Sequence, residues 1–350
     1  MAERRVAVVT GASAGVGRAV TLELARRGFD VGLVARGHAG LAAAARDVER
    51  HGGRALPLPV DVAAYGEVRE AARAAEAELG PVDVWINDAM TTIFAPVWEV
   101  DPDDLRRALE VTFLGQVWGT KVALESMMPR DRGTIVNVGS ALAFVGIPLQ
   151  SAYCSSKFAC RGFFESVRAE LAHQKSNVRL SMVHLPGVNT TQFNWCKSVF
   201  DTHPQPVPPI YQPEVAATAI VDAAIDGRRS KVVGSWNKLL VAAASIFPGL
   251  ATQYAALGAW ESQLTDKPVA PDRPANLWHP ADEEEDKGAH GIFDAKAGGV
   301  RNPEFVESLP TNAKNLALAA ARATKDALSH LPVGRLATAQ DLDGRSASRA

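Results

Sequence analysis

The chain has 350 residues, of which 47% are hydrophobic and 22% charged, the composition of a soluble globular protein. Its 37 Lys and Arg nearly balance its 39 Asp and Glu, and the formal net charge of -2 argues against a protein that binds nucleic acid or an anionic membrane surface. The three cysteines, Cys154, Cys160 and Cys196, cannot all pair and lack metal-ligand spacing, which indicates a reducing compartment and no metal site.

The N-terminus does not have the pattern of a secretory signal. Arg4 and Arg5 are followed at once by a short apolar run, 6–10, that leads into glycines rather than into a cleavage site. The longest apolar stretch, 239–251, is interrupted by Pro248 and is much shorter than the roughly 20 residues of a membrane-spanning helix. We therefore expect a cytoplasmic protein without a membrane span.

The first 190 residues alternate short β-branched runs with Ala-rich stretches of helical periodicity. Strands that are apolar almost throughout and are separated by helices predict a parallel sheet covered on both faces, which is a doubly wound α/β domain. The predicted strands are 6–10, 31–35, 56–60, 82–87, 134–139 and 178–185, and the clearest predicted helices are 16–27, 39–51 and 65–79.

The character of the chain changes after Gly187. Segment 191–211 is rich in aromatic residues and prolines, which argues against a regular element there and suggests a loop that closes over a substrate. Residues 1–264 are predicted to form one main domain, and 265–350 a polar C-terminal extension whose composition favours poor order, with a helix at 313–330. The alternative for the extension is a partner-binding role. Between these parts we expect a helix at 214–226, a last strand at 231–234 and a helical pair over 236–263 that breaks at Pro248.

A glycine-rich turn follows the first strand and opens a helix. Gly11, Gly15 and Gly17 let the backbone turn sharply and approach a pyrophosphate, which the N–H groups of the helix N-terminus can bind. The alternative is a turn chosen only for helix–strand packing, but the strand–turn–helix context favours nucleotide binding.

The end of the second strand indicates which nucleotide binds. A carboxylate there would bond the ribose 2′-OH of NAD, whereas an arginine accommodates a 2′-phosphate. This chain has Arg36 and no acid at that turn, which favours NADP(H) over NAD(H). Arg36 could instead be a solvated loop cation. Asp61, at the end of the third strand, could contact the adenine edge or cap the next helix.

A second motif carries acid–base chemistry. Tyr153 and Lys157 are four residues apart on one face of a predicted helix, so the ammonium can lie beside the phenol. Lowering a phenol pKa by about three units takes about 4 kcal/mol, which one cation at about 4 Å can supply. Ser140, at the end of a predicted strand, would bond the substrate oxygen while Tyr153 transfers the proton and a cofactor the hydride.

Together these motifs resemble the short-chain dehydrogenase/reductase family over about residues 4–235. Thr10-Gly11-x3-Gly15-x-Gly17, Asn87-Asp88-Ala89, Ser140, Tyr153-x3-Lys157 and Pro186-Gly187-Val188-Asn189-Thr190 stand in the family's order and spacing. The resemblance implies a Rossmann-type sheet, Ser140, Tyr153 and Lys157 as catalytic residues, Asn87 as a support of the central strand, and dimers or tetramers formed through helices 104–128 and 151–173. It implies that NADP(H) contacts Thr10, Gly11, Ser13, Gly15, Val16, Gly17, Arg36, Asp61, Val62, Asn87, Ala89, Tyr153, Lys157, Pro186, Gly187, Val188 and Thr190.

Three residues depart from the family pattern. Asp88 and Met90 replace small or neutral groups, and Thr112 stands where the family has an asparagine that anchors a proton-relay water. With Thr112 in that place we expect slowed rather than abolished turnover. The same departures support an alternative, an NADP(H)-binding sensor or scaffold without useful turnover.

The residues expected around the reacting carbon are apolar. Such a lining suits a lipophilic ketone or secondary alcohol, of the lipid, steroid or retinoid kind, and would reject a phosphorylated sugar. The alternative is that these side chains are simply core. They are Met90, Phe94, Ala141, Phe144, Leu149, Phe193 and Trp195.

Overall fold

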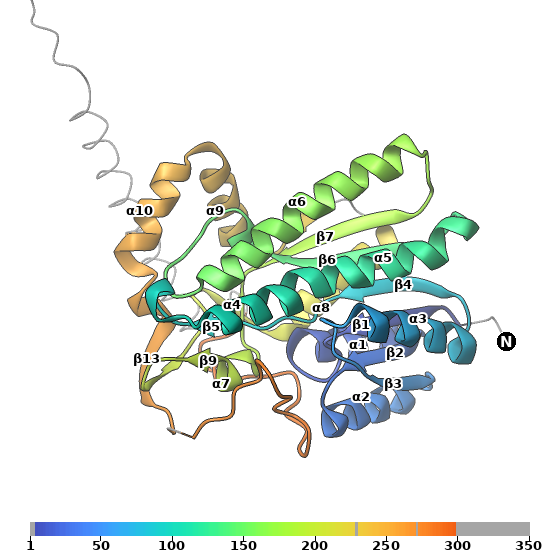
Figure 1. Ribbon diagram of the computed structural model, residues 1–350, viewed down its shortest axis with the longest axis horizontal. Helices are drawn as coiled ribbons and strands as arrows, with labels where there is room; N and C mark the ends of the chain where they lie inside the picture. Colours follow the sequence, from blue (N-terminus) through green and yellow to red (C-terminus); the bar gives the residue numbers. More distant parts are fainter. Residues whose placement is uncertain (1–3, 228–229, 271, 299–350) are drawn as a thin grey trace, which may run out of the picture.

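The central feature of the fold is a seven-stranded parallel sheet (Figure 1). The computed structural model describes residues 4–227, 230–270 and 272–298. The strand order β12-β7-β6-β4-β1-β2-β3 runs outward in two directions from β1 and β4, so the sheet is doubly wound as predicted. All six strands predicted up to Leu185 are present. The strands of the sheet are β1 (Val6–Thr10), β2 (Asp30–Ala35), β3 (Ala55–Pro59), β4 (Val82–Asn87), β6 (Thr134–Ser140), β7 (Arg179–Leu185) and β12 (Ser230–Val232).

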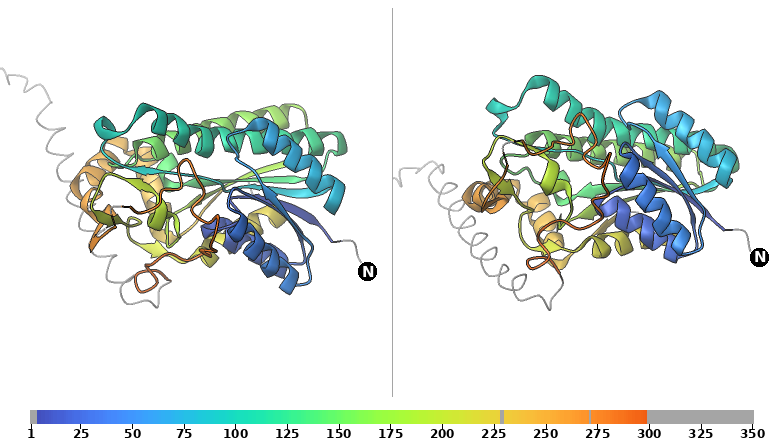
Figure 2. Two further views of the ribbon diagram at one scale, coloured as in Figure 1. Left: turned by 60° about the horizontal axis from the view of Figure 1, so that its bottom comes forward. Right: turned by 90° about the horizontal axis from the view of Figure 1, so that it is seen from below.

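Helices cover both faces of this sheet (Figure 2). One face packs against α1 (Gly15–Arg26), α2 (His38–Arg50) and α8 (Pro213–Asp226), and the other against α3 (Tyr65–Leu79), α5 (Gly115–Met127) and α6 (Ser151–His173). Side chains of the central strands are fully buried between these layers, for example Val8, Val9 and Ile86. Each such side chain contributes roughly 1.5–3 kcal/mol through burial, which is why nearly continuous apolar runs form these strands.

The predicted helix over 104–128 is interrupted. It consists of α4 (Pro102–Leu109), a π-helical turn η2 (Glu110–Leu114) and α5. Asp101 caps α4, since its side chain accepts hydrogen bonds from the backbone N–H groups of Asp103 and Asp104. The described residues also contain short 3-10 turns, namely η1 (Val97–Glu99), η3 (Met128–Arg130), η4 (Ala141–Ala143) and η5 (Glu261–Gln263).

Segment 191–211 contains short elements where the sequence indicated none. Its prolines lack an N–H donor, so its strands are only two or three residues long. They pair with strands from other parts of the chain, which anchors the segment at three places. The elements are α7 (Gln192–Trp195), β9 (Lys197–Ser198) paired with β5 (Ile93–Phe94), β10 (Thr202–Pro204) paired with β13 (Leu264–Pro268), and β11 (Ile210–Tyr211) paired with β8 (Gly187–Val188).

The predicted helical pair follows the last strand of the sheet. It consists of α9 (Ser235–Ile246) and α10 (Pro248–Gly258), and the chain breaks between them at Phe247 and Pro248 as predicted. The pair stands at the end of the molecule beside the N-terminal part of α6 (Figure 1). None of the helices within the described ranges is long and apolar enough to cross a membrane.

The polar C-terminal extension has many contacts with the main domain in its described part. We call residues 272–298 the strap. Leu277 is buried against Ile93 and Ala152, and the indole N–H of Trp278 donates to Asp104 at 2.8 Å. The polar composition of the extension predicted poor order because composition shows the acidic residues of the strap but not the basic side chains that they contact in the fold. The predicted helix at 313–330 lies outside the described residues.

A close contact between α5 and β4 gives a test of the packing. A β-carbon on Gly119 would overlap Asn87 Oδ1 and lie 2.7 Å from Trp85 Nε1. We expect Gly119→Ala to lower the free energy of unfolding by about 2 kcal/mol, although alanine is the better helix former by about 1 kcal/mol. Urea denaturation measures the change.

The matched control is Gly162→Ala in α6, where a β-carbon would meet nothing within 4 Å. We expect this variant to be more stable than the parent by about 0.5–1 kcal/mol. A stabilised Gly119→Ala variant would show that α5 can move away from β4 at no cost.

Candidate active site

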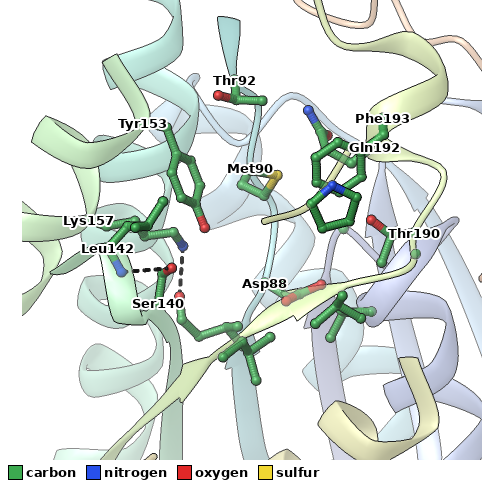
Figure 3. A pocket seen from close by; sticks show the side chains of 18 of the residues that line it. Asp88, Met90, Thr92, Ser140, Leu142, Tyr153, Lys157, Thr190, Gln192 and Phe193 are labelled. Atoms are coloured by element: carbon green, nitrogen blue, oxygen red, sulfur yellow. Dashed lines mark hydrogen bonds between the residues drawn. The ribbon is translucent and has the colours of Figure 1, made fainter. Parts of the chain in front are cut away.

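A cavity opens at the carboxyl edge of the sheet, where the strand order reverses between β1 and β4. Clefts at this position are the usual ligand sites of open α/β sheets. Its walls come from the turn after β1, the ends of β2, β3, β4 and β6, the segment after β7, helices α9 and α10, and the strap. Figure 3 shows its central part.

The glycine-rich turn forms one wall of the cavity. Gly11, Ser13, Gly15 and Val16 line it, as predicted for a phosphate-binding turn. Gly17 lies behind the wall, where a β-carbon would overlap the carbonyl oxygen of Gly11. The close approach of α1 to β1 therefore requires glycine there, which is a packing role beside the predicted contact with the nucleotide.

Two predicted cofactor residues hold the strands rather than line the cavity. Thr10 Oγ1 accepts hydrogen bonds from the N–H groups of Asp88 and Ala89, both at 3.1 Å, and so joins the ends of β1 and β4. Asn87 is 2% exposed; its Oδ1 accepts from Trp85 at 2.8 Å and its Nδ2 donates to Asn137 at 2.9 Å. Asn87 thus supports the central strand, the role that the family resemblance implies.

Ser140, Tyr153 and Lys157 meet at the opposite wall (Figure 3). Lys157 Nζ donates to the carbonyl of Val138 at 2.8 Å and lies 5.5 Å from the centre of the Tyr153 ring. The hydroxyl of Tyr153 points toward the side chains of Ser140 and Lys157 (Figure 3). The spacing of four residues on α6 and the end of β6 bring the three groups together as the sequence predicts.

The pKa of Tyr153 is set mainly by burial. Burial raises it above the ordinary value of a phenol, and this effect outweighs the lowering by the Lys157 charge and by the Ser140 hydrogen bond. The lysine thus acts in the expected direction, but alone it does not bring the pKa below its usual range.

Asp88 introduces a carboxylate into the same cavity (Figure 3). Burial raises its pKa to about 7, against the opposing effects of the Lys157 charge and a hydrogen bond from the backbone N–H of Gly17. The carboxyl therefore changes its charge close to neutral pH, next to the groups that sequence analysis assigned to proton transfer and to phosphate binding.

Thr112, the residue predicted to stand in a proton relay, does not line the cavity. Its hydroxyl is fully buried, donates to the carbonyl of Thr91 at 2.9 Å and accepts from the N–H of Thr91 at 3.0 Å. The short side chain reaches only this neighbouring backbone, so it ties η2 to the segment after β4.

The ends of β2 and β3 contribute Arg36, Asp61 and Val62 to the cavity. The guanidinium of Arg36 donates to the carbonyls of three strap residues, namely Asn276, Leu277 at 3.4 Å and Trp278 at 3.1 Å. Asp61 forms an ion pair with Arg107 and also accepts from the N–H of Ala63 in the turn before α3, but it does not cap that helix. On the other side, Ala89, Pro186, Gly187, Val188 and Thr190 line the cavity as predicted.

The predicted substrate residues divide into two groups. Met90, Ala141, Phe193 and Trp195 line the cavity. The other three do not: Phe94 and Leu149 lie in a core cluster beneath it with Cys196, and Phe144 packs against His184, 4.8 Å away between ring centres, and under Arg161. Aromatic side chains are buried wherever a core is close, and the sequence does not distinguish the two environments.

Further apolar residues of the cavity were missed because they come from distant parts of the chain. The amphipathic pattern of 236–263 indicates which face of this segment is apolar. Only the fold shows that this face lines the cavity. These residues include Leu142, Val145, Pro206, Val207, Trp236, Leu240, Ala255 and Ala259.

Comparisons with known proteins point to one family. Residues 5–198 match the model described as short chain dehydrogenase. The chain is 30% identical over 288 residues to an uncharacterized oxidoreductase, YxnA, of Bacillus subtilis, covering 82% of this chain and 81% of that protein. It is 31% identical over 243 residues to 3-dehydrosphinganine reductase of Danio rerio, covering 67% and 73% of the two chains.

A solved structure shows the same fold. The structure of a short chain dehydrogenase from Mycobacterium paratuberculosis bound to NAD has a TM-score of 0.57 to this chain and 21% identity. The match covers 65% of this chain and 96% of the other.

Asp88 gives a prediction for stability. Since its pKa is about 7 in the folded protein and near 3.9 in an unfolded chain, ionisation opposes folding increasingly from about pH 4 to about pH 7. We expect Asp88→Asn to raise the free energy of unfolding by about 4 kcal/mol at pH 8 and by much less at pH 4.5. Chemical denaturation at both values tests this.

Asp201→Asn, which changes an exposed carboxylate, serves as the control and should show no such difference. An equal gain in the free energy of unfolding for Asp88→Asn at both pH values would mean that the pKa of Asp88 is not raised in the folded protein.

Proposed function

This chain belongs to the short-chain dehydrogenase family of oxidoreductases, and we propose that it transfers a hydride between a nicotinamide dinucleotide and a ketone or secondary alcohol carried on an apolar molecule. The observation that carries the proposal is the meeting of Ser140, Tyr153 and Lys157 on a cavity that also holds the glycine-rich turn.

The residues of the cavity fit a dinucleotide, the cofactor type of this family. The turn Gly11–Val16 and the segment from Pro186 to Thr190 both line it, and the small side chains of the turn leave room for phosphates at the start of α1. When bound, the nicotinamide supplies or accepts the hydride.

The chain's own residues handle the proton. In ketone reduction, Tyr153 donates its hydroxyl proton to the substrate oxygen, and Ser140 holds that oxygen by a hydrogen bond. Lys157 is fixed by the carbonyl of Val138, so its charge stays beside the phenol and stabilises the phenolate that remains. A raised pKa keeps Tyr153 protonated at neutral pH, which suits the reductive direction.

Apolar residues of the cavity support the substrate class. Phe193, Trp195, Trp236 and Leu240 present apolar surface there, which supports a lipophilic ketone or alcohol and opposes a sugar phosphate. The relative named 3-dehydrosphinganine reductase supports a ketone as the reacting group.

Two observations bear on the phosphate of the dinucleotide. Arg36 supports the NADP(H) preference predicted from the sequence, because it lines the cavity at the end of β2. Its guanidinium, however, is bonded to three backbone carbonyls of the strap, and the carboxylate of Asp282 lies on the same part of the cavity.

The competing function is a dinucleotide-binding sensor with little turnover. The specific observation in its favour is Asp88, whose ionisation near neutral pH would change the charge beside the reacting groups. The complete set of Ser140, Tyr153 and Lys157 favours the enzyme.

Tyr153→Phe separates these functions. We expect the variant to bind the dinucleotide as the parent does and to lose reduction of apolar ketones by about 10²–10⁴-fold, since only the proton donor is removed. Fluorescence titration with NADH and NADPH measures binding, and turnover of a ketone panel measures activity.

Tyr65→Phe removes a phenol hydroxyl that bonds Glu125 outside the cavity and is the matched control. Undiminished turnover in Tyr153→Phe would remove Tyr153 from the mechanism, and tight binding by the parent without turnover of any ketone would favour the sensor.

The raised pKa of Tyr153 predicts the pH dependence. Because the phenol must be protonated to act as an acid and its pKa is raised, ketone reduction should stay level through neutral pH and fall only above the ordinary pKa of a phenol, about 10. The profile is measured in Asp88→Asn, which lacks the second ionisation near pH 7. A fall between about pH 6 and 8 in that variant would mean that the phenol pKa is lowered instead.

A further inference from the structure

The strap crosses the carboxyl edge of the sheet and reaches the N-termini of α1 and α2 (Figure 2). The carbonyl of Gly288 accepts a hydrogen bond from Gly15 at 3.1 Å, and the carbonyl of Glu283 accepts one from Ala39 at 3.1 Å. The strap thus bonds directly to the glycine-rich turn and to the first turn of α2, and it forms the outer wall of the cavity.

Asp282 is part of this wall and is only 5% exposed. Its carbonyl accepts from the N–H of Gly40 at 3.2 Å. A β-carbon on Gly37 would overlap its Oδ1, and one on Gly40 would overlap its Oδ2. The carboxylate of Asp282 therefore fills the volume that a side chain at Gly37 would otherwise take.

One oxygen of this carboxylate lacks a partner. Oδ2 of Asp282 is buried and has no hydrogen-bond partner within the described residues, although Asp282 lines the cavity together with Ser13 and Arg36. A buried charged oxygen without a partner is costly, so a ligand that donates a hydrogen bond there would be stabilising.

In dinucleotide-binding sheets, an acidic residue about 20 residues after the glycine-rich turn accepts the ribose 2′-OH of NAD. In this chain β2 ends at Ala35 and is followed by Arg36 and Gly37, none of which carries a carboxylate. We propose that Asp282 supplies the missing carboxylate from the other end of the chain, so that the cofactor is NAD(H) rather than NADP(H). This inference rests on one part of the proposed function, namely that a nicotinamide dinucleotide binds in this cavity.

Charge supports this assignment. A 2′-phosphate would come next to the buried carboxylate of Asp282, and like charges in such surroundings repel strongly. The cation predicted to neutralise that phosphate is engaged, because Arg36 donates to the carbonyls of Leu277 and Trp278. A ribose hydroxyl, in contrast, can donate to this carboxylate.

The position of Asp282 is well determined by its neighbours in the strap. On one side, Trp278 is bonded to Asp104 and its ring lies beneath the Arg107 guanidinium. On the other side, Asp286 forms an ion pair of 3.2 Å with Arg18, and Glu283 bonds His38 at 2.7 Å. The carboxylate is therefore held in place before a ligand arrives, which is what a selective contact needs.

The test compares the equilibrium binding of NADH and NADPH by the full chain with that of Asp282→Asn and Asp282→Ser, using cofactor fluorescence without substrate. We expect the parent to bind NADH at least tenfold more tightly than NADPH. Both variants should weaken NADH, tighten NADPH and reduce the preference at least tenfold. Glu284→Gln, which removes an exposed acid two residues away, should leave the preference unchanged. Thermal unfolding of each variant establishes that it is folded.

Three results would overturn the proposal: a parent that prefers NADPH, Asp282 variants that weaken both cofactors equally, or an equal shift in Glu284→Gln. Failure of the proposed function is seen separately. If NADH binds in an Asp282-dependent way but no ketone or alcohol is turned over, the hydride-transfer function fails while the role of Asp282 stands. Binding of neither cofactor would overturn both.

Discussion

The parallel pairing of β1 with β4 is the constraint on which the rest of the molecule depends. The chain turns away from the sheet in opposite directions at these two strands, and the edge between them is left open for a ligand. Thr10 fixes that edge, because its side-chain hydroxyl bonds the two N–H groups that follow β4. The glycine-rich turn on one side and Asp88 and Met90 on the other are placed by this one junction.

Burial has opposite effects on the groups around the cavity. It keeps Lys157 in one position on the carbonyl of Val138, which is favourable for a charge that must stay beside Tyr153. It also raises the pKa values of Tyr153 and Asp88, so both groups are held nearer to their neutral forms. Burial thus keeps the Tyr153 hydroxyl protonated at neutral pH and gives the cavity, through Asp88, a group whose charge changes near pH 7.

The elements of the sheet and the position of Tyr153 and Lys157 could be predicted because both depend on local spacing: apolar runs for strands, and four residues for one helix face. What could not be predicted depends on contacts between distant segments. Phe94 and Phe144 are aromatic residues of the type that lines an apolar cavity, but they pack into the neighbouring core. Thr112 bonds the backbone of Thr91. The ordered strap was not predicted either. Its acidic sequence is typical of a solvent-exposed segment, and only the fold shows that it bonds to Arg18, Arg36 and the start of α2.

The strap also joins the two ends of the described chain. Gly15 and Gly288, which share a hydrogen bond, are separated by about 270 residues, so that contact closes a very long loop. The sheet can form from contacts made earlier in the chain, whereas this side of the cavity is complete only after the strap has been synthesised and has docked. A ligand that touches both the turn and the strap therefore acts as a non-covalent cross-link, and its binding free energy is added to the cohesion between the first and the last parts of the fold.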